Sequence, residues 1–516
     1  MTQAMTIEEK VGQMFTVGFH GLEAPQYLLE WLAQGRVGGI ILFARNVASP
    51  EQLADLTTSL HQAAKYPLLI GIDQEGGTVA RLRDGFSESP GAMALASASD
   101  KQMMRTEQVS AVLGEEMCAI GINWNYAPAV DLLYSAENPT MGTRSFGTDP
   151  EQVSGFAEAA VKGFQRAGVA ACAKHFPGLG ETAIDTHLEL PRLNVSEAQL
   201  LDRDLMPYRV VIEAGIASIM TTHTIIEALD PNYPVTLSPL VIQHLLRDQL
   251  GFEGVVTTDC MEMKAIADNF GAGESAVLAA KAGVDIILVS HTAETQAEAY
   301  DMLLKAVLEG EVSEDIIDSA VARVEKLKSQ FAITAPPDLD SIRIPDHLAI
   351  MEDAARAGTV LLYGKIPALS GRILAIEFAS ALESGIVESG GQTGFAYRLR
   401  ERLPGIEIIP VTGSGIEAAN MEQLTLSAGQ ADWVIVATRN AAWNTHQRTL
   451  ADRIIRGASQ SVLLCLRTPF DAQVLPQATA AICTCGDSSP SLDAAIGALT
   501  GEFIPDGRLP IPLTLP

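Results

Sequence analysis

The order of apolar and polar segments predicts an α/β fold, namely a (β/α)8 TIM-type barrel followed by a smaller C-terminal αβα sandwich domain. Short apolar runs alternate with amphipathic helical patterns over the first two thirds of the chain, as expected for parallel strands buried on both faces. Seven or more such units occupy about 300 residues, which favours a closed barrel over an open sheet. A second α/β pattern begins near residue 357, and the 516-residue chain exceeds the roughly 250–300 residues of a single core.

The runs expected to form barrel strands are short and rich in aliphatic residues. They are residues 37–43, 68–73, 123–130, 169–175, 217–223, 254–259 and 284–290. The helices expected between them include 151–167 and 240–250, which begin after Asp149-Pro150 and Ser238-Pro239, typical helix-start pairs. A long helical region, 292–331, follows the last of these strands.

Three segments describe the expected domain organisation: a barrel over residues 1–335, a linker over 336–356 and a C-terminal domain over 357–516. The linker follows from the sequence Ala335-Pro336-Pro337-Asp338, because adjacent prolines interrupt regular structure. One helix, 449–457, is expected between two strands of the second domain. The strands predicted there are 358–363, 372–378, 406–411, 433–438, 461–466 and 480–484.

The composition is acidic, with 35 Lys and Arg against 63 Asp and Glu and a formal net charge of −28. Such a chain is repelled by phosphate backbones and anionic membranes, so neither nucleic acid nor a membrane is an expected partner. The N-terminus has no basic segment followed by an apolar one, and no run reaches 18 apolar residues, which predicts a cytoplasmic protein without a signal peptide or transmembrane segment.

The six cysteines are sparse and show no CxxC spacing, which predicts reduced thiols and no metal site. Cys483 and Cys485 are the nearest pair, in an apolar run over 480–485 that predicts a strand. Alternate residues of a strand share one face, so these two thiols are expected side by side as small buried hydrophobes.

Polar residues stand at the carboxyl ends of successive predicted strands, or on the loops that follow them. Barrels carry their functional residues at these ends, so we expect a single active site there, although any one residue alone would equally suit a structural role. The residues are Asp73, Arg144, Lys174, His175, His223, Asp259, Ser290 and His291.

Asp185 and His187 flank one residue in a predicted loop. A carboxylate at this spacing can accept a hydrogen bond from the imidazole and prepare it as general acid and base, although metal ligation or a structural bond would suit the pattern equally. Asp259 has an apolar strand behind it and the expected pocket in front, which suits a nucleophile, an electrostatic stabiliser or a structural ion pair. With a proton donor, such a carboxylate could cleave a glycosidic bond through a covalent intermediate.

Arg81, Arg144 and Lys174 stand out in so acidic a chain. They are candidates for binding hydroxyls or a carboxylate, with Asp73 accepting hydrogen bonds from sugar hydroxyls. The alternative is that Arg81 or Arg144 pairs with an acidic residue of a neighbouring loop.

Several short sequences are specific enough to indicate a family. They are GIDQEGG at 71–77 with Arg81, GTRSFG at 142–147, KHFPG at 174–178, DTH at 185–187, GFEGVVTTD at 251–259 and MKAI at 263–266. Together they span about residues 7–330 and resemble glycoside hydrolase family 3, specifically its bacterial β-N-acetylglucosaminidase (β-hexosaminidase) branch. The chain from about residue 357 resembles the sandwich domain of that family.

The resemblance implies a role for each matched residue. Asp259 matches the nucleophile, and His187 matches the acid/base, which forms a dyad with Asp185. The residues implied to hold the sugar are Asp73, Arg81, Arg144, Lys174 and His175. The implied substrate is a terminal β-linked N-acetylglucosaminide, such as a cell-wall muropeptide of peptidoglycan recycling or a chitin fragment, and no cofactor or metal is required. Separately, we expect a monomer or homodimer.

Three residues depart from the family pattern. Leu179 replaces a common His, Thr78 a common Arg, and Cys260 a second Asp after the nucleophile. The remaining alternatives are a β-glucosidase or β-xylosidase of the same family, an N-acetylglucosaminide phosphorylase, a Schiff-base lyase that uses Lys174, and an inactive sugar-binding protein.

Overall fold

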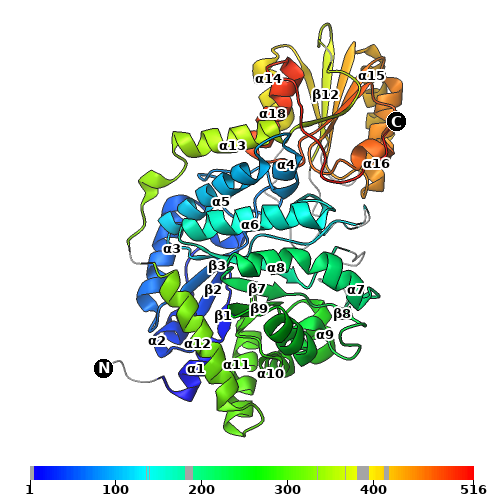
Figure 1. The fold of residues 1–516 in the computed structure, drawn as a ribbon. Helices are drawn as coiled ribbons and strands as arrows, with labels where there is room; N and C mark the ends of the chain where they lie inside the picture. The colour runs from blue at the N-terminus through cyan, green and yellow to red at the C-terminus, as the bar shows by residue number, and fades with distance from the viewer. Residues whose placement is uncertain are drawn as a thin grey trace.

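The computed structural model describes residues 5–515 except 135, 137, 139, 181–189, 334, 367, 380–393 and 412–417. The described chain forms two regions that pack against each other, a barrel and a smaller region built around an open sheet (Figure 1). The predicted residues Asp185 and His187 lie outside the described residues.

The first region is a closed barrel of eight parallel strands in the order β1-β10-β9-β7-β5-β4-β3-β2, which confirms the predicted fold class. Every residue of these strands except Asp259 is buried. The strands are β1 (Phe15–Val17), β2 (Gly39–Leu42), β3 (Leu69–Ile72), β4 (Trp124–Asn125), β5 (Ala170–Phe176), β7 (Ser218–Thr221), β9 (Val255–Cys260) and β10 (Ile286–Val289).

Two strands differ from the prediction. β1 was not predicted, because its three residues directly follow helix α1 (Ile7–Gln13) and are too short for a period to show. β4 is much shorter than the predicted 123–130, since Pro128 has no N–H to donate and only an isolated bridge between Ala129 and Lys174 continues the pairing.

Helices surround the barrel. The predicted helix 151–167 is α6, with Asp149 capping its first turn and Pro150 at its first position. The predicted region 292–331 divides into two helices because the chain turns at Gly310, whose φ is +78°. The helices are α2 (Gln26–Gln34), α3 (Pro50–Ala63), α4 (Ala92–Ser97), α5 (Gln102–Ala119), α6 (Pro150–Arg166), α7 (Glu197–Gln199), α8 (Met206–Glu213), a helical segment at Leu240–Gln249, α9 (Lys264–Phe270), α10 (Ala272–Ala282), α11 (Ala293–Leu308) and α12 (Glu314–Gln330). A small additional sheet pairs β6 (Arg192–Leu193) with β8 (Ile225–Ile226).

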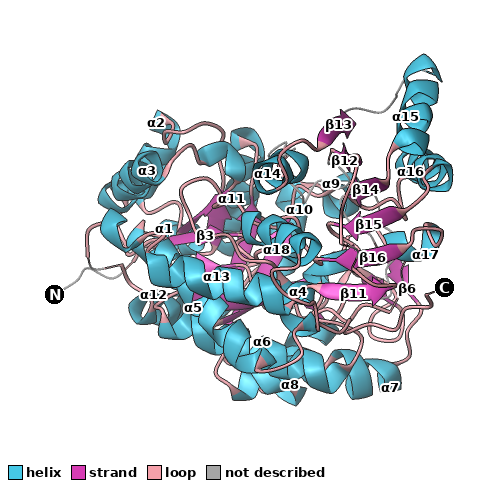
Figure 2. Cartoon of the chain, turned by 90° about the horizontal axis from the view of Figure 1, so that it is seen from above, coloured by secondary structure: helices cyan, strands magenta, loops and turns pink. Residues whose placement is uncertain are grey.

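The second region is a six-stranded sheet in the order β11-β16-β15-β14-β12-β13, visible as a row in Figure 2. All its pairs are parallel except that of β11 with β16, and helices cover both faces, which gives the predicted αβα layers. Its strands are β11 (Val360–Tyr363), β12 (Ile373–Phe378), β13 (Glu407–Val411), β14 (Trp433–Thr438), β15 (Ser461–Cys465) and β16 (Ala480–Cys483). Its helices are α14 (Phe395–Arg402), α15 (Ala418–Gln430), α16 (Thr445–Gly457), α17 (Asp471–Val474) and α18 (Ser489–Thr500).

The two regions share one apolar cluster. Met93, Leu133 and Met141 of the barrel region are buried together with side chains of the C-terminal sheet. The segment predicted as a linker contains α13 (Pro345–Ala357), which contacts α4 and α5 on one side and α18 on the other. The C-terminal region is therefore packed firmly onto the barrel.

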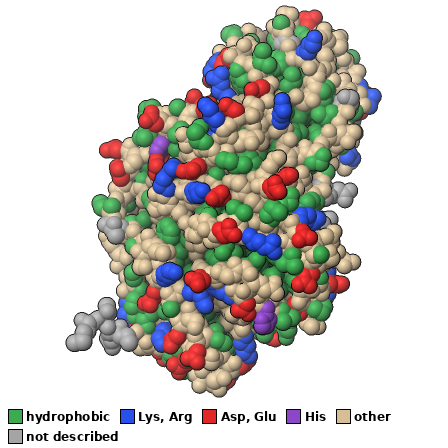
Figure 3. Space-filling view, in the orientation of Figure 1, with side chains coloured by type: hydrophobic (Ala, Val, Ile, Leu, Met, Phe, Trp, Pro, Cys, Tyr) green, Lys and Arg blue, Asp and Glu red, His purple; other side chains and the backbone are tan. Residues whose placement is uncertain are grey.

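The cysteines are free thiols, and all except the half-buried Cys118 are buried. The strand predicted over 480–485 ends at Cys483, because Cys485 has a φ of +54° that no strand residue adopts. The two Sγ atoms still lie 3.6 Å apart, as neighbouring buried thiols. In the part of the chain that the structure describes, no helix is long and apolar enough to cross a bilayer. Acidic and basic side chains are interspersed on the face shown in Figure 3, as is typical of a solvated surface.

Candidate active site

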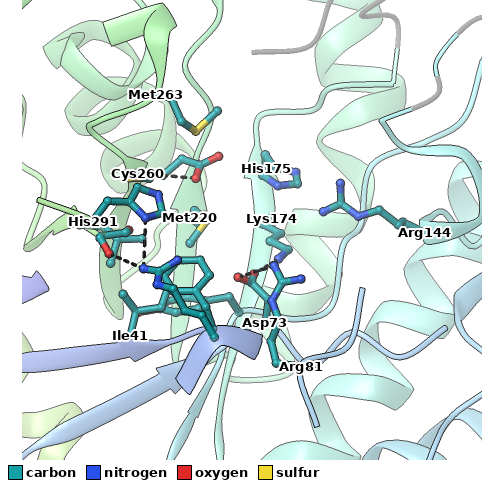
Figure 4. A pocket seen from close by; sticks show the side chains of 16 residues that line it. Ile41, Asp73, Arg81, Arg144, Lys174, His175, Met220, Cys260, Met263 and His291 are labelled. Atoms are coloured by element: carbon teal, nitrogen blue, oxygen red, sulfur yellow. Dashed lines mark hydrogen bonds and ion pairs between the residues drawn. The ribbon is translucent and has the colours of Figure 1, made fainter. Parts of the chain in front are cut away.

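A cavity of about 200 Å³ opens at the carboxyl ends of the barrel strands. Eight of the predicted site residues line it, namely Asp73, Arg81, Arg144, Lys174, His175, Asp259, Ser290 and His291, whereas the predicted His223 does not. Figure 4 shows Cys260, Met263 and His291 on one side of this cavity and Lys174, His175 and Arg144 on the other. The full lining is Ile41, Phe43, Arg45, Asp73, Arg81, Tyr126, Arg144, Lys174, His175, Met220, Asp259, Cys260, Met263, Leu288, Ser290 and His291.

Asp73, Arg144, Lys174 and His175 form one side of the cavity, which we call the polar wall. In it, Lys174 contacts two carboxylates. Its Nζ donates to Oδ1 of Asp73 at 2.7 Å and lies 2.7 Å from Oε1 of Glu75. Burial alone lowers the pKa of Lys174, but the two carboxylates raise it above its usual value. Lys174 therefore remains a charged donor although its side chain is almost fully buried.

Asp73 stands directly after β3 and faces two cations. Burial raises the pKa of Asp73, but Lys174 and then Arg81, which lies 3.5 Å away, lower it below its usual value. Asp73 is thus an ionised carboxylate, able to accept hydrogen bonds from a ligand's hydroxyl groups.

Arg144 pairs with Glu75 in the bidentate geometry that guanidinium and carboxylate groups favour. Nε and Nη2 donate to the two carboxylate oxygens at 2.9 and 2.8 Å, and Nη1 donates to the carbonyl of Thr140 at 3.0 Å. Arg144 therefore both pairs with a loop acid, as the alternative prediction held, and lines the cavity.

His175 is held by a carboxylate that sequence reasoning missed. Its Nδ1 lies 2.8 Å from Oδ2 of Asp131, which is fully buried. Asp131 also accepts the backbone N–H of Leu179 at 2.7 Å, so that the KHFPG loop is fixed by one side chain. This arrangement orients the imidazole toward the cavity.

Asp259 lies near the end of β9 and is the one residue of the eight barrel strands that keeps partial exposure. Its Oδ1 accepts the backbone N–H of Cys260 at 2.7 Å, which fixes the rotation of the carboxylate. Met220 and Met263 contribute apolar surface to the same cavity. Burial raises the pKa of the neighbouring Cys260 to about 12, so this residue is a neutral thiol at physiological pH.

His223 was predicted at the rim but has a structural role instead. The imidazole is fully buried and does not line the cavity. Its ring nitrogens form hydrogen bonds with Oγ1 of Thr236 at 2.8 Å and with the carbonyl of Cys260 at 2.9 Å. The imidazole therefore helps to hold the backbone next to Asp259.

Other lining residues were not singled out from the sequence. Phe43 and Arg45 follow β2 and lie next to His291, with the guanidinium carbon of Arg45 4.1 Å from the centre of the Phe43 ring. Their position at the carboxyl end of the predicted strand 37–43 was the signal that would have found them. No group of three or more metal-ligating side chains occurs among the described residues.

The charged cavity lies at the carboxyl ends of a closed parallel barrel, where barrel enzymes carry their active sites. Residues 6–327 match the model of the "Glycosyl hydrolase family 3 N terminal domain". The chain belongs to glycosyl hydrolase family 3, which confirms the resemblance found in its sequence.

Similar proteins carry related names. "Beta-hexosaminidase A" of Pseudoalteromonas piscicida is 35% identical over 331 residues, covering 59% of this chain but only 55% of that protein, so the chain matches about half of its length. A "Beta-hexosaminidase" of Alkalilimnicola ehrlichii is 40% identical over 267 residues, or 51% of this chain and 76% of the relative. A solved family 3 β-N-acetylglucosaminidase from Paenibacillus sp. str. FPU-7 superposes with a TM-score of 0.93 at 36% identity, covering 99% of this chain and 100% of that one.

Proposed function

We propose that this protein is a retaining exo-β-N-acetylglucosaminidase that releases terminal β-linked N-acetylglucosamine from muropeptide or chitin-type fragments. One observation carries the proposal: Asp259 shares a single cavity with an ionised Asp73 and the buried cations Lys174 and Arg144. The names of the relatives and of the solved neighbour support the amino-sugar substrate.

In the first step of the proposed mechanism, a carboxylate oxygen of Asp259 attacks the anomeric carbon. The bond from that carbon to the leaving oxygen breaks, and the imidazolium of His187 gives its proton to the departing oxygen. In the second step, water gives a proton to His187 as its oxygen attacks the anomeric carbon, and Asp259 is released. Asp185 is assigned the role of orienting His187; both residues lie outside the described part of the chain.

The polar wall is assigned to hold the non-reacting hydroxyls of the sugar. Asp73 accepts hydrogen bonds, while Lys174 and Arg144 donate them. His175 adds one ring nitrogen, because its other nitrogen is engaged by Asp131. These groups are already held by one another, so that little reorganisation is needed when a ligand enters.

The test compares nitrophenyl β-N-acetylglucosaminide with nitrophenyl β-glucoside. We expect the wild type to prefer the N-acetyl substrate, Asp259→Ala to be inactive, and His187→Ala to lose roughly 10²–10⁴-fold in rate. Asp268→Ala, which removes an exposed carboxylate from α9, is the matched control and is expected to keep full activity. Preference for the glucoside, or an active Asp259→Ala variant, would contradict the proposal.

Azide distinguishes the two roles. A nucleophile variant of a retaining enzyme lets azide attack the substrate directly, whereas an acid/base variant lets azide attack the glycosyl-enzyme. We therefore expect the α-glycosyl azide from Asp259→Ala and the β-glycosyl azide from His187→Ala. Product analysis in phosphate buffer completes the test, since formation of a sugar phosphate in place of the free sugar would identify a phosphorylase.

A further inference from the structure

The C-terminal region contacts the barrel loop that carries Arg144. We call residues 133–148 the Arg144 loop; it leaves the barrel after β4 and returns to α6. Nε1 of Trp443, on the loop between β14 and α16, donates to the carbonyl of Ala136 at 2.6 Å. This is a hydrogen bond from the C-terminal region to the backbone of a loop that lines the active site.

The indole ring of Trp443 also rests on Gly142. A Cβ atom at Gly142 would lie 3.2 Å from Cη2 of the indole, and Gly142 has a φ of +42° that disfavours other residues. Gly142 begins the tight turn that ends at Arg144. The neighbouring Met141 is 1% exposed and belongs to the apolar cluster of the C-terminal sheet, against which Trp443 also packs.

Two backbone contacts connect this turn to the guanidinium. The N–H of Arg144 donates to the carbonyl of Met141 at 2.8 Å, and its Nη1 donates to the carbonyl of Thr140 at 3.0 Å. Trp443 therefore supports residues on both sides of Thr140, whose carbonyl aims Arg144. The pairing with Glu75 fixes the far end of the same side chain.

The loop that bears Trp443 has a rigid base. Asp471 is fully buried, and its carboxylate accepts the backbone N–H of Ala442 at 2.9 Å and the hydroxyl of Thr438 at 2.6 Å. The backbone N–H of Trp443 itself donates to the carbonyl of Asn440 at 3.0 Å. This matters because Trp443 can hold the Arg144 loop in place only if Trp443 is itself held in place.

A second contact holds the other end of the Arg144 loop. The backbone N–H of Thr148 donates to the carbonyl of Pro510 at 3.3 Å, and a Cβ atom at Gly147 would lie 2.6 Å from that oxygen. The C-terminal region thus contacts the loop at Ala136 and Gly142 and again at Gly147 and Thr148.

We propose that Trp443 is a positioning residue for Arg144, through which the C-terminal region completes the active site of the barrel. This inference rests on the proposed function only in that Arg144 is assigned to bind the sugar. The C-terminal region then contributes to turnover by holding a loop, without placing a side chain of its own in the cavity lining described above.

The first experiment measures kcat and KM on nitrophenyl β-N-acetylglucosaminide. Trp443→Ala is expected to lower kcat/KM about 10- to 100-fold, because displacing a binding group by about 1 Å can cost 10²-fold. Trp443→Phe keeps a ring and loses the donor, and we expect a loss of about two- to tenfold, the value of one hydrogen bond. Trp433→Phe, in β14 of the same sheet and packed in a different cluster, is the matched control and should stay within about twofold of wild type.

A double-mutant cycle distinguishes positioning from general structural support. In an Arg144→Lys background, the effect of Trp443→Ala on kcat/KM should largely disappear, since a residue that acts through Arg144 has nothing left to position. Fully additive losses would overturn the inference. Full kcat/KM in Trp443→Ala would overturn it as well.

Hydrogen exchange keeps this test separate from the proposed function. Measured without substrate, backbone amides of residues 140–147 should exchange faster in Trp443→Ala and in Trp443→Phe than in Trp433→Phe. A wild type inactive on every amino-sugar glycoside would defeat the proposed function, while unchanged exchange of residues 140–147 in an otherwise active enzyme would defeat only the role of Trp443. Thermal melting of each variant identifies global unfolding. If Trp443→Ala is unfolded, the kinetics and hydrogen exchange of Trp443→Phe decide whether Trp443 positions Arg144.

Discussion

Nδ1 of His175 lies 2.8 Å from Oδ2 of Asp131, a carboxylate with no exposed surface. The same side chain accepts the backbone N–H groups of His175 at 3.1 Å and of Leu179 at 2.7 Å. One buried carboxylate therefore fixes both the imidazole and the course of the loop that follows β5. Leu179, which departs from the family pattern, contributes its backbone to this arrangement while its side chain is buried.

We expect Asp131→Asn to lower both activity and stability. An Asn side chain has only one acceptor oxygen for the three N–H groups, and its NH2 faces donors, so charge-assisted hydrogen bonds of about 1.5–3 kcal/mol each are lost. The measurement is kcat/KM together with Tm. Asp149→Asn is the control, because Asn caps a helix as well as Asp does, and α6 should keep its stability. An Asp131→Asn variant with wild-type kinetics would show that the orientation of His175 does not matter.

Glu75→Gln tests the electrostatic centre of the polar wall. Glu75 is ionised, since Arg144 and Lys174 lower its pKa well below the usual range although burial opposes them. Removal of its charge leaves two buried cations with one carboxylate fewer, which is expected to cost about 3–5 kcal/mol of stability and to raise KM. Urea unfolding and steady-state kinetics measure these effects, with the exposed Glu23→Gln as control. Unchanged stability would mean that Asp73 alone neutralises the cations.

We expect Lys328→Met to change how the stability of the protein depends on pH. Lys328 is buried in α12 with its Nζ 2.6 Å from Oε1 of Gln13, and burial lowers its pKa to about 7, although Glu325 opposes this. The unfolded chain, with a Lys pKa of about 10.4, binds more protons between pH 7 and 10, so stability rises with pH across this window. The cost in free energy of unfolding that comes from burying a protonated Lys328 is at its full value below pH 7 and absent above about pH 10.4.

The Met side chain removes that penalty, so its gain in Tm over wild type should be largest at pH 6–7 and fade toward pH 10. The exposed Lys326→Met, two residues earlier on the same helix, should show no such trend. A gain in Tm that is constant from pH 6 to pH 10 would show that folding does not lower the pKa of Lys328, which would then stay protonated in the folded chain throughout that range.

Gly180→Ala tests the close approach of two barrel loops. A Cβ atom at Gly180 would lie 1.7 Å from the backbone carbonyl of Leu132, which cannot move without moving the chain after β4. We expect a lower Tm and a reduced kcat, since Gly180 leads directly into the segment that carries the predicted acid/base. Gly394→Ala is the control, because a Cβ there makes only an ordinary contact of 3.4 Å with Leu492. Normal kinetics in Gly180→Ala would separate this loop contact from turnover.

Strand positions were predictable wherever buried aliphatic runs exceed three residues. β9 and β14 agree with their predicted bounds within one residue, whereas β1 was missed because three residues show no period. β4 is shorter than predicted because Pro128 interrupts the ladder.

The site residues likewise divide into those that the sequence predicted and those that it did not. Asp73, Lys174 and Asp259 were found because parallel strands bring their carboxyl ends to one rim. Their partners were not found, since Asp131 reaches His175 across 44 positions and a spacing of that length carries no signal. His223 occupies a rim position in sequence, yet the fold uses it to support the backbone at Cys260.

The sequence by itself determined the barrel, the sandwich and the family, because local periodicity, helix caps and short motifs depend on neighbouring residues in the chain. Only the tertiary structure decided which charges pair, which polar residues line the cavity, and that Trp443 reaches the loop of Arg144. Those contacts join residues tens to hundreds of positions apart, and their energies depend on burial and distance, which exist only once the chain has folded.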